Sequence, residues 1–118
     1  MQTAVIDKEI DICALTDLIE DAGTTALIND TQIALFYVKK TGQVFALENY
    51  DPFSEANVLS RGIIGSIGAD LVVASPIYKQ HFKLQTGECV EDTSIAVKAY
   101  PVNIQDGRIR LTFLGKGS

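Results

Sequence analysis

The run Ile33-Ala34-Leu35-Phe36-Tyr37-Val38 is the longest unbroken apolar stretch of this sequence. The polar segment Lys39-Lys40-Thr41-Gly42 follows it, and residues 44–47 are again mostly apolar. Two apolar segments on either side of a short turn that contains glycine predict a β-hairpin. Because the first segment is apolar at every position, we expect its strand to be central in a sheet and covered on both faces.

A second hairpin is predicted near the end of the sequence. Apolar and polar residues alternate over residues 102–104 and again over residues 109–113, on either side of Gln105-Asp106-Gly107-Arg108. Alternation with a period of two around Asp-Gly is a strong short-range hairpin signal.

The remaining segments complete a mostly-β pattern. Further strands are expected over residues 10–14, 25–29, 70–74 and around 81–84. One short helix is predicted over residues 17–22, with Thr16 as its N-cap and Gly23 at its end. The sequence therefore predicts a small β-sandwich or barrel with one short helix.

The length of 118 residues suffices for one hydrophobic core and no second one. We expect a single domain over residues 10–114. The two ends offer little apolar surface to bury, so we expect a mobile N-terminal segment at 1–9 and a C-terminal tail at 115–118.

The net charge of −5 is concentrated in the first 21 residues. These hold six acidic side chains and one lysine, whereas the nine acidic and nine basic side chains of the remainder cancel. A nucleic-acid partner requires a basic face, so we expect none. We interpret the acidic stretch as a solvated end that keeps the protein in solution.

The sequence also argues against a membrane segment and a metal centre. A membrane span needs roughly 20 apolar residues, and residues 1–9 lack the basic and apolar regions of a signal peptide. We therefore expect a cytoplasmic protein with no membrane contact. Cys13, Cys89 and His81 are the only cysteines and histidine. They supply fewer ligands than a closed zinc site or an iron–sulfur cluster requires, so we expect free thiols and no metal.

No grouping of residues predicts catalysis. Asp51 and Glu55 lie in an irregular stretch that leaves their relative geometry undefined, and His81 has no marked nucleophile beside it. Glycines recur at a spacing of three over residues 62–68, but a strand-like segment follows where a phosphate-binding loop needs a helix. We interpret these glycines as turn residues.

Two segments together resemble the Rieske iron–sulfur family. The first is Leu47-Glu48-Asn49-Tyr50-Asp51-Pro52-Phe53, followed by Val58-Leu59-Ser60-Arg61-Gly62. The second is Val73-Ala74-Ser75-Pro76-Ile77-Tyr78-Lys79-Gln80-His81-Phe82-Lys83-Leu84, followed by Thr86-Gly87-Glu88-Cys89. In that family a Cys-x-His loop and a Cys-x-x-His loop hold a [2Fe–2S] cluster. The resemblance implies a Rieske-like β-sandwich of short antiparallel strands.

The same resemblance implies that all four ligand positions have been replaced. They fall on Asp51, Phe53, Ser75 and Tyr78. Phenylalanine cannot ligate iron, and the other three are poor substitutes for thiolate and imidazole. We therefore expect no cofactor and no catalytic residue, and we expect Phe53 and Tyr78 to pack into the space of the cluster.

This cluster-free pattern is similar to that of one family, the small subunits of assimilatory NAD(P)H-dependent nitrite reductase. The resemblance implies a large partner subunit with FAD, siroheme and a [4Fe–4S] cluster, in a complex that reduces nitrite to ammonia. This chain would then be non-catalytic and would support assembly or activity. Two alternatives stay open: a free-standing cluster-less interaction module, and a Rieske-type electron carrier, which the missing ligands disfavour.

The two loops are also the predicted docking surface. Pro52 and Pro76 stiffen them, which lowers the entropy lost on binding. Leu59 and Ile77 are candidate exposed anchors, and Arg61 is a candidate charged contact. We expect this end of the domain to dock on the large subunit, the alternative being docking through a sheet face.

Overall fold

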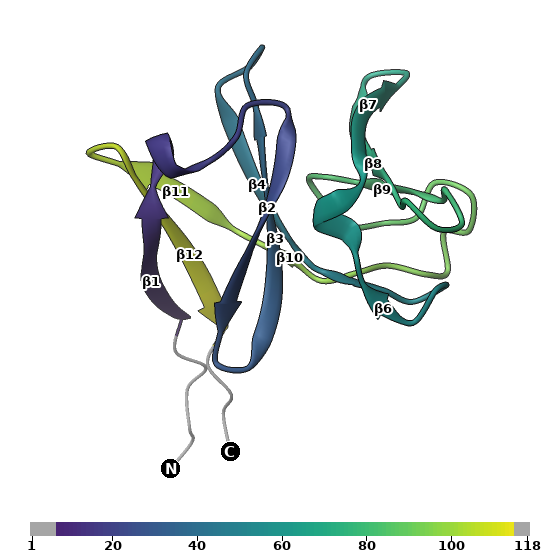
Figure 1. Ribbon diagram of the computed structural model, residues 1–118, viewed down its shortest axis with the longest axis horizontal. Helices are drawn as coiled ribbons and strands as arrows, with labels where there is room; N and C mark the ends of the chain where they lie inside the picture. The colour runs from purple at the N-terminus through teal and green to yellow at the C-terminus, as the bar shows by residue number, and fades with distance from the viewer. Residues whose placement is uncertain (1–6, 115–118) are drawn as a thin grey trace.

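The computed structural model describes residues 7–114, which form two lobes side by side (Figure 1). In the larger lobe, a three-stranded sheet of order β1-β12-β11 faces a four-stranded sheet of order β10-β4-β3-β2. In the smaller lobe, a three-stranded sheet of order β7-β8-β9 accompanies the short β5-β6 pair. All strand pairs named in these sheets are antiparallel, so the predicted mostly-β class with antiparallel strands is confirmed.

The strands are short, as predicted. Their bounds are β1 Asp7–Ala14, β2 Ala22–Ile28, β3 Thr31–Val38, β4 Gln43–Glu48, β5 Tyr50–Asp51, β6 Ala56–Asn57, β7 Ile63–Ile67, β8 Asp70–Ala74, β9 His81–Lys83, β10 Ala99–Tyr100, β11 Val102–Gln105 and β12 Arg108–Leu114. Two 3₁₀ turns interrupt them, η1 Leu15–Asp17 and η2 Leu59–Arg61.

Strand β3 is central and covered on both faces, as its unbroken apolar run predicts. Ile33 and Leu35 pack against Ile109 and Leu111 of β12, within the larger lobe. Side chains alternate across a strand, so Ala34, Phe36 and Val38 point the other way. These three pack in the core that the two lobes share, and that core also contains Leu59, Val73 and Phe82. A single strand therefore joins the sandwich to the small lobe that carries the loops of interest.

Both predicted hairpins are present. Strands β3 and β4 pair across the 39–42 turn, from Val38–Gln43 to Ile33–Glu48. Strands β11 and β12 pair across Asp106-Gly107, whose φ values are 52° and 73°. Two successive residues with positive φ form the type I′ turn that Asp-Gly favours.

The predicted helix over residues 17–22 is wrong. The Asp17 carboxylate accepts a hydrogen bond from the Ala14 backbone N–H at 3.0 Å, so it caps a three-residue 3₁₀ turn instead of starting a helix at Thr16. The chain then extends, because Asp21 donates its N–H to Tyr37 O and strand β2 pairs with β3 from Ala22 onward. Sheet pairing outweighs the local helix signal here.

The N-terminal boundary also differs from the expectation. Strand β1 begins at Asp7, whose backbone pairs with Leu114, so residues 7–9 belong to the domain. Residues 1–6 and 115–118, which include the predicted tail, lie outside the described residues.

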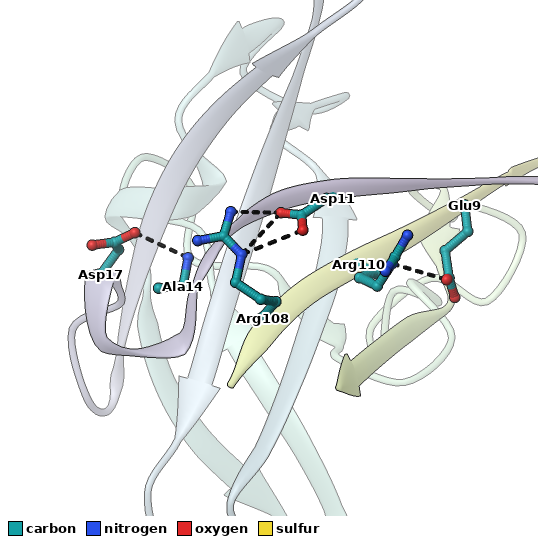
Figure 2. Close-up of polar contacts among 6 residues, drawn as sticks. All are labelled: Glu9, Asp11, Ala14, Asp17, Arg108 and Arg110. Carbon is teal, nitrogen blue, oxygen red and sulfur yellow. Dashed lines mark hydrogen bonds and ion pairs between the residues drawn. The ribbon is translucent and has the colours of Figure 1, made fainter. Parts of the chain in front are cut away.

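Part of the acidic first segment is paired with arginines and is not simply a solvated end. Arg108 donates to both carboxylate oxygens of Asp11, with the shortest contact at 2.6 Å (Figure 2). Arg110 Nε lies 3.0 Å from Glu9 Oε1. These pairs connect β1 to β12, and the Arg108 hydrogen bond lowers the pKa of Asp11 below its usual value. Within residues 7–114, no helix is long and apolar enough to cross a membrane.

Candidate functional site

The two loops that the resemblance singles out lie side by side, as expected. The first follows Asp51, the last residue of β5, and leads to β6. The second follows β8 and starts with Ser75. The Ser75 hydroxyl donates a hydrogen bond to Asp51 Oδ2, although the two residues are 24 positions apart.

Asp51 is the centre of this contact. Its side chain is fully buried, at 0% exposure, and its two oxygens accept hydrogen bonds from three donors. The Phe53 backbone N–H donates to Oδ1 at 2.9 Å, and the Ser54 hydroxyl donates to Oδ2, also at 2.9 Å. With the Ser75 hydroxyl, these donors satisfy a buried carboxylate that would otherwise be costly to remove from water.

Each loop is also closed by its own backbone. The Glu55 N–H donates to Asp51 O at 2.8 Å, and the Ser75 N–H donates to Gln80 O at 2.9 Å. Glu55 and Lys79 adopt positive φ, 55° and 63°, to make these tight closures. Both loops are therefore compact before any partner binds.

Phe53 packs inward, in agreement with the expectation. Its half-buried ring lies 6.1 Å from the Phe82 ring, measured between centroids, and it packs against the shared core. The expectation for Tyr78 is wrong, because its side chain is 61% exposed. Asp51 and Ser75 are buried where the loops meet and Phe53 packs on Phe82, whereas the Tyr78 side chain is exposed to solvent.

Leu59 is not the exposed anchor that its loop context indicated. It is fully buried in the shared core. Asn49 holds the turn in this position, since its backbone oxygen accepts the Leu59 N–H at 3.1 Å and its side-chain oxygen accepts the Ser60 N–H at 2.7 Å. These bonds fold η2 against the core and direct the leucine inward.

Arg61 and Ile77 are exposed, consistent with contact residues. A further apolar side chain that the sequence reasoning missed is Ile63, at 77% exposure. Ile63 pairs with Ala74 at the end of β8, directly before the second loop. Side chains alternate across a strand. In β7, Ile64 packs inward, so Ile63 and Ile67 lie on the opposite, exposed face. The even spacing of these two isoleucines was the signal in the sequence.

His81, Glu91 and Cys89 form a structural cluster. The His81 Nδ1 lies 2.6 Å from Glu91 Oε2, and the His81 backbone N–H donates to Glu91 Oε1 at 2.8 Å. Cys89 is fully buried, and burial raises the pKa of its thiol. A protonated, buried thiol is a poor nucleophile, which agrees with the predicted structural roles of His81 and Cys89.

The residues at the two loops do not fit a [2Fe–2S] cluster. The four positions that the resemblance gives to cluster ligands hold one carboxylate, Asp51, which already accepts three hydrogen bonds, together with Ser75, Phe53 and Tyr78. Within residues 7–114, no group of three or more His, Cys, Asp or Glu side chains, the His81 cluster included, has an arrangement that could hold a metal ion.

Comparison with known proteins shows the family of this chain. Residues 9–112 match the family described as Rieske-like [2Fe-2S] domain. The NADH nitrite reductase small subunit of Escherichia coli K12 is 45% identical over 101 residues, which cover 86% of this chain and 94% of that protein. This chain belongs to the nitrite reductase small-subunit family.

A solved structure supports the same family. The crystal structure of a Mycobacterium tuberculosis protein assigned as an NADH-dependent nitrite reductase small subunit has a TM-score of 0.88 and 40% identity. It covers 94% of this chain and 99% of its own. A member of this family can thus be superimposed on nearly all of this chain, and the Rieske-like fold is confirmed.

The nitrite reductase small-subunit family also has a relative of a different length. The NAD(P)H nitrite reductase large subunit of Klebsiella oxytoca is 43% identical over 98 residues, which cover 83% of this chain and 10% of that protein. A region similar to this chain is therefore part of a large-subunit polypeptide.

Proposed function

We propose that this chain is the non-catalytic small subunit of an NAD(P)H-dependent nitrite reductase. It binds a large subunit that carries FAD, siroheme and a [4Fe–4S] cluster, and it supports the assembly or activity of the complex that reduces nitrite to ammonia in the cytoplasm. The observation that carries the proposal is the 45% identity over 94% of the Escherichia coli small subunit.

The Klebsiella oxytoca relative supports a physical association with a large subunit. There, a region 43% identical to this chain forms 10% of the large-subunit polypeptide. A covalent tether raises the effective concentration of a contact between two domains and does not create the contact. A domain joined to a large subunit in one protein is therefore expected to bind a large subunit non-covalently in another.

The chemistry of the loops supports a non-catalytic role. The Asp51 carboxylate is buried and fully engaged, His81 is paired with Glu91, and Cys89 is buried. An electron carrier of the Rieske type needs two thiolates and two imidazoles at the cluster, and the corresponding positions here hold none. A free-standing interaction module remains the alternative that the binding experiment excludes or supports.

The docking surface that we propose is the exposed part of the loop end. Ile77 is 48% exposed and follows the stiff Ser75-Pro76 segment. Arg61 is exposed at the end of η2, directly before Gly62 and β7 in the chain. Leu59 is excluded by its burial. Tyr78 and Ile63 add exposed apolar surface near the same β7–β8 edge.

Co-expression of the tagged chain with the large subunit encoded in the same organism tests both parts of the proposal. We expect the wild type to retain the large subunit, and the double variant Ile77→Glu, Arg61→Ala to lose at least about tenfold in affinity, as truncated hot spots do. The matched control is Leu27→Glu, which alters a side chain that is 69% exposed on β2 in the other lobe.

The outcomes separate the alternatives. Unchanged binding by a folded loop variant would move the interface to a sheet face. Failure of the wild type to retain the large subunit would contradict the small-subunit function and favour a free-standing module.

A further inference from the structure

We infer that the hydrogen-bonded link between Asp51 and Ser75 joins the two loops in this chain, in the place where cluster ligation joins them in cluster-bearing Rieske domains. The consequence is a loop end that is ordered without iron. This inference rests on the side-chain contacts and does not depend on the proposed function.

The link is what connects the two loops to each other. The first loop is closed by Glu55 N–H to Asp51 O, and the second by Ser75 N–H to Gln80 O, so each backbone bond stays within its own loop. Among the hydrogen bonds between described residues, the one from Ser75 to Asp51 crosses from loop 75–80 to loop 51–55.

Burial makes this link strong. Asp51 is 0% exposed and Ser75 is 1% exposed, so water does not compete for the bond. A hydrogen bond in the low-dielectric interior is electrostatically stronger than the same bond in water. Losing the Ser75 hydroxyl would leave a buried carboxylate with one donor fewer, which costs more than the loss of a solvated contact.

The direction of the bond extends its effect along the second loop to Ile77. The Ile77 backbone N–H lies 3.4 Å from Ser75 Oγ and donates to it. The serine hydroxyl therefore accepts from Ile77 and donates to Asp51, so that a chain of hydrogen bonds runs from the second loop into the first. Ser75 is thus a positioning residue for Ile77.

The packing below the link is complementary. Phe53, two residues after Asp51, rests against Phe82 of β9, which is the strand that the second loop leads into. The Asp51–Ser75 hydrogen bond and the Phe53–Phe82 contact thus both join the first loop to the segment that contains the second. Neither contact uses a metal ligand, so the supply of iron should not alter the order of the loops.

Amide hydrogen exchange of the full-length chain tests this inference. In Ser75→Ala, we expect exchange to accelerate by about tenfold or more in peptides that cover both loops, since a buried bond to a carboxylate is lost. The matched control is Ser54→Ala, which removes a donor to the same carboxylate from within the first loop. It should leave the exchange of residues 76–80 unchanged.

A second measurement keeps the test valid even if the variant is poorly folded. Wild-type chain from iron-depleted and iron-replete cultures should show the same exchange in both loops. Two results would overturn the inference: wild-type exchange rates in a folded Ser75→Ala variant, or slower exchange in wild-type chain that carries stoichiometric iron and sulfide.

Discussion

Two aromatic side chains on the neighbouring loops, Phe53 and Tyr78, contribute differently to stability. Phe53 is half-buried against Phe82, whereas Tyr78 is 61% exposed. Truncating a buried phenylalanine typically costs about 3–5 kcal/mol, and half-burial reduces the cost to about 1.5–3 kcal/mol. We expect Phe53→Ala to lower the free energy of unfolding by that amount, measured by urea denaturation with an unchanged m-value.

Tyr78→Ala is the matched control, with an expected change within about 0.5 kcal/mol, as for other exposed positions. Equal losses in the two variants would show that Tyr78 fills the space between the loops after all.

At single positions, the sequence located the two loops correctly but did not predict which of their side chains are buried. The Asp51-Pro52-Phe53 and Ser75-Pro76 loops were found by resemblance, and their adjacency is confirmed. The link between Asp51 and Ser75 was missed because an ionisable side chain is seldom fully buried. Leu59 was misplaced because the hydrogen bonds that fold η2 inward come from Asn49, ten residues earlier, and no local pattern reports them.

Gly62, directly before β7, and Gly65, within β7, differ in how closely other atoms approach them. A Cβ at Gly62 would lie 2.3 Å from Ala74 O, whereas a Cβ at Gly65 meets nothing within 4 Å. Overpacking a tight site typically costs about 1–3 kcal/mol. We expect Gly62→Ala to lower the free energy of unfolding by that amount in the same urea measurement. Gly65→Ala should keep a free energy of unfolding close to that of the wild type. A tolerated Gly62→Ala would contradict the close approach of Gly62 to Val73 and Ala74 of β8.

The pairing of β1 with β12 should depend on pH through Asp11. Arg108 lowers the folded-state pKa of Asp11, so the pair stabilises the protein above the unfolded pKa of about 3.9. That contribution is lost as the pH falls through the folded pKa. We expect Arg108→Gln to be less stable than the wild type at neutral pH, and the difference to shrink towards zero near pH 2.

Lys40→Gln, at an exposed turn position, is the control for a general charge effect. A stability difference between Arg108→Gln and the wild type that stays constant across the acidic range would show that the arginine acts by packing and not through Asp11.

Among the elements, the two hairpins and the central strand β3 were predictable. The 3₁₀ turn η1 was not, and neither was strand β7, which runs through Gly65 where turn glycines were expected. The Asp106-Gly107 hairpin and the doubly covered β3 follow from local periodicity and turn chemistry, and both are present. Residues 17–22 carry helix signals. However, the Asp17 carboxylate accepts the Ala14 backbone N–H three residues earlier, and the pairing of β2 with β3 keeps the following residues extended. Long-range pairing of this kind leaves no trace in a local window.

At the scale of the molecule, a compact sandwich supports a small lobe whose two loops are joined by their own side chains. The shared core built on β3, Leu59 and Phe82 fixes the small lobe to the sandwich. The Asp51–Ser75 link then fixes the loops to each other. On the proposed function, the joined loops form a preformed surface for a large subunit.

Sedimentation velocity of the purified chain mixed with the large subunit tests this account most directly, with the iron content of the small chain measured beforehand. We predict that small chain free of iron and sulfide sediments together with the large subunit as one complex. Absence of binding, or binding that appears only after the small chain is loaded with iron and sulfide, would contradict the account.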